Sequence, residues 1–195
     1  MRVTLTALAL VLALGAAFDA QQRRPASPAG AAATQIGEHW IEITYGRPIL
    51  RGRTNMFGSG ADYGVKLNDG GPVWRAGAND TTLLRNGVAV DIGGSRVPAG
   101  DHAILIELTS PTEWTFIVSD QARQRSFDPD NTTELWGGFN YRPDRDVARA
   151  PMKVETLPYS VDQLTWLITD VTPAGGTLRV MWERSMGSVG FRVGQ

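Results

Sequence analysis

The sequence contains no cysteine, and this absence excludes several features at once. The protein has no disulfide, no thiolate nucleophile and no cysteine that could carry the lipid of a lipoprotein. A chain of this size does not need disulfides, because a domain of about 150 residues buries about 70% of its unfolded surface. Its stability is therefore expected to come from an ordinary apolar core, to which the six tryptophans can contribute heavily.

Histidine is also scarce, which limits metal binding and catalysis. His39 and His102 are far apart and have no partner at metal-ligand spacing, so the sequence predicts no metal site and no cofactor. Segment 128–134 is rich in side-chain oxygens, but Pro129 and a missing glycine break the calcium-loop pattern. No Gly-x-Ser-x-Gly elbow and no recognised serine–histidine spacing support nucleophilic catalysis.

The chain has little net charge, with 19 lysines and arginines against 20 acids. A nucleic-acid-binding protein needs a basic face to neutralise phosphates, and a near-neutral chain offers none. We therefore expect no nucleic-acid partner. The balance also gives no polybasic membrane anchor.

A long hydrophobic run is missing as well. The apolar stretch from Val3 to Leu14 is shorter than the roughly 20 residues that a membrane span needs, and charged residues follow from Asp19. Arg2 precedes the stretch and Gly15-Ala16-Ala17 offers a cleavage site, as in a signal peptide. We predict a signal peptide at 1–20, export, and no stable membrane anchor after cleavage.

The remainder of the chain is predicted to be a short leader followed by one domain. Residues 21–36 are rich in Ala, Pro, Gln and Gly without periodicity, which predicts a disordered leader. Residues 37–195 are predicted to form a single β domain. Within them, Trp40–Tyr45 alternates with Ile41, Ile43 and Tyr45 on one face, the pattern of a half-buried strand.

Turn signals then divide the domain into short strands. Asn86-Gly87 between 81–85 and 88–92 predicts a hairpin, and Gly93-Gly94 predicts the next turn. Residues 52–71 are glycine-rich and indicate a loop or hairpin rather than a helix. Further strands are expected at 102–108, 114–118, 152–156, 165–171, 177–182 and 189–193, with one or two helical turns at 119–125 and a long packed loop at 127–143.

This pattern predicts an all-β fold, namely a single-domain antiparallel β-sandwich, with a jelly-roll-like barrel as the alternative. Four tryptophans lie in strand patterns and are expected in the core: Trp40, Trp114, Trp166 and Trp182. Trp74 and Trp136 lie in or near loops, which makes them the better candidates for an exposed aromatic platform.

Several short motifs resemble those of a known family. They are Tyr45-Gly46-Arg47-Pro48, Gly52-Arg53, Phe57-Gly58, Tyr63-Gly64, Val73-Trp74-Arg75-Ala76-Gly77-Ala78-Asn79, Pro98-Ala99-Gly100, Glu113-Trp114-Thr115, Trp136-Gly137 and Trp182-Glu183. Over roughly residues 35 to 193 the chain resembles the bacterial family called domain of unknown function 2911 (DUF2911). The resemblance implies an exported bacterial protein, periplasmic or secreted, and supplies no activity. In that family Tyr-Gly lies almost directly before Trp-Arg, whereas here Val65 to Pro72 intervenes, which predicts an inserted loop beside the motif.

The best candidate site combines arginines with polar and aromatic groups of these loops. Its residues are Arg47, Arg53, Tyr63, Trp74, Arg75, Asn79 and Asp80. Arginine presents a rigid fork of donors that suits carboxylate, phosphate or sugar hydroxyls. The alternative is structural: the arginines clamp loop carbonyls or acids such as Glu42 and Glu183, and Asn79 makes an Asx turn.

Three functional hypotheses follow. The first is a noncatalytic module that binds a small molecule, a glycan or a partner protein, with Trp74 or Trp136 exposed beside Arg75 and Asn79. The second is a hydrolase or lyase that uses the Arg/Asn loop and buries an ionisable group in a closed pocket. The third is a structural envelope component, which would show a large apolar patch or an open strand edge.

Overall fold

The computed structural model describes residues 25–194, so the predicted signal peptide and the start of the leader lie outside the described part. The described chain is almost entirely β structure. It comprises β1 (Ala29–Ile36), β2 (His39–Gly46), the 3-10 helix η1 (Gly60–Asp62), α2 (Val65–Asn68), β3 (Leu83–Asn86), β4 (Val90–Ile92), β5 (Ser95–Val97), β6 (Gly100–Ser110), β7 (Glu113–Ser119), the 3-10 helix η2 (Pro143–Arg145), β8 (Asp146–Thr172) and β9 (Gly175–Val193). No helix within residues 25–194 is long and apolar enough to span a membrane.

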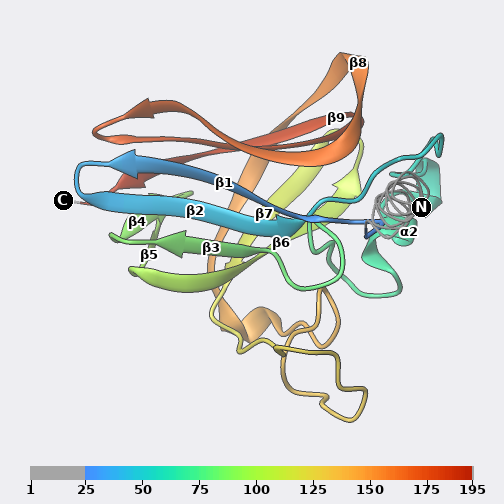
Figure 1. Ribbon diagram of the computed structural model, residues 1–195, viewed down its shortest axis with the longest axis horizontal. Helices are drawn as coiled ribbons and strands as arrows, with labels where there is room; N and C mark the ends of the chain where they lie inside the picture. The colour runs from blue at the N-terminus through green and yellow to red at the C-terminus, as the bar shows by residue number, and fades with distance from the viewer. Residues whose placement is uncertain (1–24, 195) are drawn as a thin grey trace, which may run out of the picture.

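All strand pairs are antiparallel, and their order is β1-β2-β3-β6-β7-β8-β9-β4-β5. The long strand β8 connects two layers, because its first part up to Met152 pairs with β7 and its part from Lys153 onward pairs with β9. Figure 1 shows β8 and β9 lying over the strands β1, β2 and β3. The predicted all-β antiparallel sandwich is confirmed.

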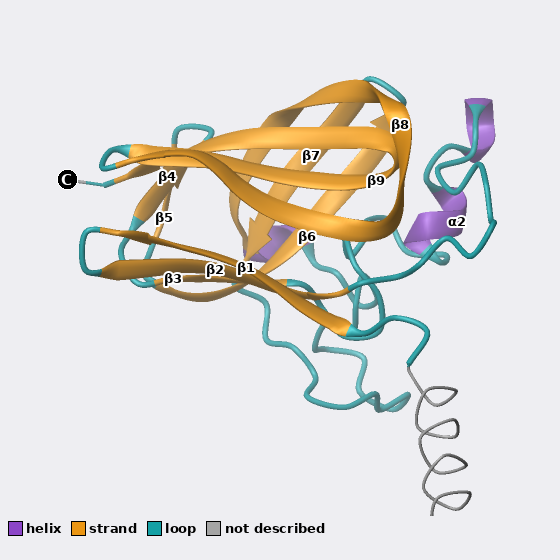
Figure 2. Ribbon diagram, turned by 45° about the horizontal axis from the view of Figure 1, so that its top comes forward, coloured by secondary structure: helices purple, strands orange, loops and turns teal. Residues whose placement is uncertain are grey.

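The two layers are also linked beside β2, where the chain leaves the sheet. The Leu50 amide donates to the Asp162 carbonyl at 2.7 Å, and the Leu164 amide donates to the Pro48 carbonyl at 3.0 Å. These bonds hold the start of the 47–80 segment against β8. The segment contains α2, which lies at the end of the molecule opposite the C-terminus (Figure 2).

The core lies between the two layers and is rich in aromatic rings. Trp114, Trp166 and Trp182 are buried in it, as predicted from their strand patterns. The expectation for Trp40 is wrong, since this side chain is 56% exposed. Side chains alternate between the two faces of a strand. Because Ile41 and Ile43 of β2 point into the core, Trp40 points away from it.

The N-terminal part of the domain differs from the prediction. Residues 29–36 of the expected disordered leader form strand β1, which pairs with β2 along its whole length from Ala29–Gly46 to Ile36–His39. Gly37, at φ 60°, allows the tight turn between the two strands. Alanine has a low intrinsic strand preference, so the neighbouring strand, rather than the local sequence, orders this segment.

The predicted hairpin at Asn86-Gly87 is also wrong. Strand β3 is already paired with β2 on one side and with β6 on the other, so β4 has no free edge there. Instead the side-chain amide of Asn86 donates to the carbonyls of Val88 (2.9 Å) and Pro98 (2.7 Å), and the chain crosses to the other layer. There β4 pairs with β5 and β9, and the predicted Gly93-Gly94 turn joins β4 to β5.

Residues 52–71 were expected to hold no helix, but they contain η1 and the four-residue helix α2.

The helical turns predicted at 119–125 do not form. There the side chain of the buried Gln121 takes over the hydrogen bonding: it donates to the carbonyls of Thr133 (2.9 Å) and Asn140 (2.7 Å) and accepts from the Arg142 amide (2.9 Å).

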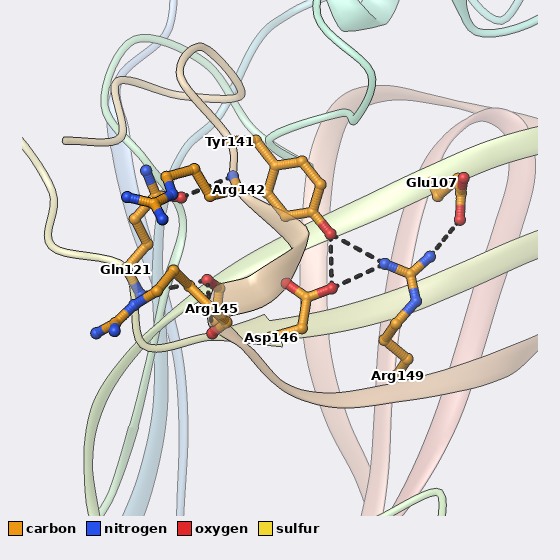
Figure 3. Close-up of polar contacts among 8 residues, drawn as sticks. Glu107, Gln121, Tyr141, Arg142, Arg145, Asp146 and Arg149 are labelled. Atoms are coloured by element: carbon orange, nitrogen blue, oxygen red, sulfur yellow. Dashed lines mark hydrogen bonds and ion pairs between the residues drawn. The ribbon is translucent and has the colours of Figure 1, made fainter. Parts of the chain in front are cut away.

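The β7–β8 loop, residues 120–145, contains the long packed loop that was predicted at 127–143. Leu135 and Tyr141 cover an apolar patch of Leu105 and Ile117 on β6 and β7. Near the end of the loop, the Tyr141 hydroxyl donates to Asp146 at 2.6 Å, and Arg149 donates to both groups at 2.9 and 2.8 Å (Figure 3). Arg149 also pairs with Glu107 of β6. These contacts fasten the loop to the sheet.

Candidate functional site

The Val73–Asn79 run begins as an extension of the sheet. The amides and carbonyls of Trp74 and Ile106 exchange two hydrogen bonds of 2.8 Å, which attaches Trp74 to β6. The Trp74 ring packs edge-on against Phe57 and Trp114, with ring centroids 5.6 and 6.2 Å away. Trp74 is only 2% exposed, so the prediction that it forms an exposed platform is wrong. Trp136, the other candidate, is half-buried and packs on Phe127.

The backbone after Trp74 is held in one conformation from both sides. Trp166 of β8 donates its indole N–H to the Ala76 carbonyl at 2.9 Å. Ala76 and Asn79 adopt φ values of 49° and 65°, which non-glycine residues rarely adopt. Ala78 passes so close to β2 that a Cβ on Gly46 would lie 2.0 Å from its carbonyl oxygen. The run therefore displays its side chains from a fixed backbone.

Arg75 extends from this run and is largely enclosed. Its Nη1 donates to the Asn79 carbonyl at 2.7 Å, its guanidinium lies 5.9 Å from the centre of the Phe139 ring, and its Nη2 is 3.8 Å from an Asp69 oxygen. Burial lowers the pKa of Arg75, and the nearby Asp69 charge partly offsets this effect. The side chain is 14% exposed, so it clamps its own loop and still reaches a surface.

Arg75 lines a cavity of about 480 Å³ next to α2, and we call this cavity the basic pocket. Trp74, Trp182, Met56 and Leu67 contribute buried apolar groups to its lining. Its polar lining includes Arg51, Arg53, Lys66, Arg75, Asp69 and Asn79. The pocket therefore brings together four of the residues predicted from the sequence: Arg53, Trp74, Arg75 and Asn79.

The basic pocket has an excess of positive charge. It is lined by four cationic side chains, and Asp69 is its single acid. Within residues 25–194, no carboxylate forms an ion pair with Arg51, Arg53 or Lys66. Arg53 is oriented by bonds to the carbonyls of Leu50 (3.0 Å) and Ile49 (2.8 Å). The uncompensated charge is the distinctive property of this site.

Three other predicted site residues lie outside the lining of the basic pocket. Arg47 donates to the Leu164 carbonyl (3.4 Å) and the Thr165 hydroxyl (3.3 Å) of β8, so it ties the two layers together. The buried Tyr63 hydroxyl accepts the Trp114 indole N–H at 2.8 Å, and burial raises the pKa of Tyr63. Asp80 accepts the Thr81 amide at 2.7 Å and pairs with Arg123 at 3.3 Å.

The structural alternative for these arginines is partly right. Arg47, Arg53 and Arg75 do donate to loop or strand carbonyls, as that alternative expects. The acids named with it have other partners. Glu183 accepts the backbone amides of Asn55 and of Met56, the latter at 2.9 Å, and the nearest arginine to Glu42 is Arg85 at 3.8 Å.

Sequence reasoning missed three charged residues of the pocket: Arg51, Lys66 and Asp69. Arg51 precedes the Gly52-Arg53 motif, and Lys66 and Asp69 lie within the intervening segment Val65–Pro72. Their charge was visible in the sequence. However, only the folded loop shows that α2 carries the segment to the same cavity as Arg75.

The basic pocket suits binding better than proton transfer. Neither histidine lines it, and its one carboxylate, Asp69, has a side chain that is 71% exposed. Acid–base catalysis usually employs a group whose pKa is shifted by a water-poor environment. Within residues 25–194, no group of three or more His, Asp or Glu side chains is arranged to hold a metal ion.

Comparison with protein families places the chain in one of them. The model of the family described as "Protein of unknown function (DUF2911)" matches residues 27–191, so the chain belongs to this family. The match begins just before β1 and therefore includes most of the segment predicted as a leader. No curated protein and no solved structure matched the chain.

Proposed function

We propose that this DUF2911 protein is a noncatalytic binding protein whose basic pocket holds a small anionic ligand. The observation that carries the proposal is the gathering of Arg51, Arg53, Lys66 and Arg75 around one cavity that contains a single acid. Like charges repel one another, so such a cluster is most stable when an anion neutralises it. The volume of about 480 Å³ lies in the usual range for small-molecule sites.

The details of the pocket favour an anion over a neutral glycan. A glycan site is expected to expose an aromatic face, but both tryptophans of the lining, Trp74 and Trp182, are almost fully buried. Arginine forks match carboxylate and phosphate oxygens in geometry and charge. The ligand class we propose is therefore a small carboxylate or phosphate compound.

A hydrolase or lyase is the less supported alternative. Such an enzyme needs a positioned base or nucleophile near the bound substrate. Asp69 is the only lining residue with a carboxylate, and no histidine lies there. The arginines can orient and neutralise an anion without transferring a proton, because arginine keeps its charge in proteins.

The proposal is tested by titrating ¹⁵N-labelled protein with inorganic phosphate or citrate at low salt and recording backbone amide shifts. We expect saturable shifts at Arg75 and Asn79. The double variant Arg51→Gln/Lys66→Gln removes two exposed charges of the pocket and should weaken binding about tenfold.

The matched control is Arg125→Gln, which removes an exposed charge outside the lining of the basic pocket. It should change the dissociation constant by less than about twofold. If wild-type protein shows no saturable shifts with either anion, the proposed function is wrong. If the control weakened binding as much per charge removed as the double variant does, the proposal would also be contradicted, because binding would then follow net charge alone.

A further inference from the structure

We infer that Asp69 is a built-in competitor for the ligand: its carboxylate lies beside Arg75 where an acidic group of the ligand would bind. This inference rests on the proposed function and adds a means by which the pocket's affinity is set. Asp69 Oδ2 is 3.8 Å from Arg75 Nη2, and both residues line the basic pocket. A ligand that bonds to this guanidinium must displace the carboxylate or share the arginine with it.

Asp69 is held loosely, which makes displacement easy. At 3.8 Å the contact is longer than the roughly 2.7–2.9 Å of a charge-assisted hydrogen bond. Elsewhere in the protein, the Arg85–Asp101 pair makes two such bonds of 2.8 and 3.0 Å. Within the described residues, the Asp69 carboxylate accepts no hydrogen bond, and its side chain is 71% exposed.

The backbone, in contrast, fixes the position of Asp69. It follows α2 with φ 51°, in the left-handed region, and Gly70 follows with φ 84°. The Gly71 amide closes this turn on the Asn68 carbonyl at 2.9 Å. The turn therefore holds a negative charge at the pocket, although no bond holds the carboxylate itself.

Arg75 does not depend on Asp69 for its position. The Asn79 carbonyl accepts from Nη1, and Phe139 lies against the guanidinium. Gly137 leaves room for the guanidinium, since a Cβ there would lie 2.5 Å from Arg75 Cζ. When Asp69 swings away, Arg75 stays in place with a free Nη2, so the site for the ligand's acidic group is already formed.

Asp69→Asn isolates the charge, because asparagine has nearly the same size and tolerates the left-handed conformation. The variant should bind inorganic phosphate and citrate about three- to tenfold more tightly than wild type, the effect of removing one like charge a few ångströms from a bound anion. The same amide titration measures it. Asp62→Asn, on the neighbouring η1 and outside the pocket lining, changes net charge equally and should alter affinity less than about twofold.

The outcomes separate this inference from the proposed function. Saturable wild-type binding that becomes tighter only in Asp69→Asn supports both. Saturable wild-type binding that Asp69→Asn leaves unchanged or weakens overturns the inference and keeps the proposed function. Equal tightening in Asp62→Asn also overturns it, because net charge would then explain the gain. Absence of saturable wild-type binding overturns both.

Discussion

The Arg75 side chain is 14% exposed, and its guanidinium connects three parts of the chain: its own loop through Asn79, the α2 segment through Asp69, and the β7–β8 loop through Phe139. The sequence allowed a clamping role or a binding role for this arginine. In the structure the same side chain has contacts of both kinds, since different nitrogens face the loop carbonyl and the pocket. The two roles are separable by mutation.

Replacing Arg75 with alanine should lower the free energy of unfolding by roughly 1–3 kcal/mol. The Asn79 carbonyl loses its donor, and the packing on Phe139 is lost. Urea unfolding followed by tryptophan fluorescence measures the change. Arg125→Ala, an exposed site, should stay within about 0.5 kcal/mol of wild type. A change of the same small size for Arg75→Ala would show that the clamp contributes nothing to stability.

At the scale of elements, the β7–β8 loop shows how an irregular segment is fixed without helix or strand. Buried glutamine amides replace backbone pairing, and Tyr141 anchors the end of the loop (Figure 3). Burial raises the pKa of Tyr141, and its hydrogen bond to the Asp146 carboxylate raises it further. The second Asp146 oxygen has no hydrogen-bond partner within the described residues. Tyr141 and Arg149 therefore supply the side-chain hydrogen bonds that the Asp146 carboxylate accepts.

This environment gives a pH dependence of known sign. A tyrosine with a raised pKa keeps its proton in the folded state above about pH 10, where the unfolded chain loses it. Its contribution to stability is therefore complete below about pH 10 and declines as the pH rises above that value. Tyr63 has a raised pKa as well, so it contributes in the same direction.

We expect Tyr141→Phe to lower the free energy of unfolding by about 1–3 kcal/mol at pH 8, because Asp146 loses a donor. The further loss between pH 9 and pH 11 should be smaller than in wild type, since only Tyr63 remains of the two shifted tyrosines. Urea unfolding across this range is the measurement, and Tyr159→Phe, which removes an exposed hydroxyl, is the control. An unchanged pH slope in Tyr141→Phe would contradict the assignment.

At the scale of the whole molecule, we propose that the chain is exported to the periplasm or secreted. The described fold is compatible with removal of a signal peptide, because its first strand, β1, begins only at Ala29 and pairs with β2 along its whole length. Cleavage near Ala17 or Ala20 leaves every described strand intact. The absence of cysteine means that the exported fold needs no oxidising enzyme.

Protein purified from its native host should therefore begin between Phe18 and Arg23, since the Gly15-Ala16-Ala17 run offers the cleavage site. N-terminal sequencing of the periplasmic or secreted fraction makes the measurement. Retention of Met1 on a cytoplasmic protein would refute export.

Much of the fold was predictable from local pattern. Alternation in Trp40–Tyr45 and in Trp114–Val118 marks strands whose apolar face meets the core, and Gly93-Gly94 marks a true turn. The prediction of a hairpin at Asn86-Gly87 was wrong because turn propensity reflects only the local sequence and carries no information on the pairing of β3 with β2 and β6. The leader prediction failed for the same kind of reason, as an alanine-rich segment became strand β1 beside β2.

The sequence by itself determined the fold class, the family and the arginine–asparagine run, because these depend on periodicity and on residue types that can be read in order. The tertiary structure alone decided which charges share a cavity. It buried Trp74, directed Arg47 and Asp80 to other partners, and brought Arg51, Lys66 and Asp69 to Arg75. The physical reason is that electrostatic interaction depends on distance and solvent exposure, and long-range packing fixes both.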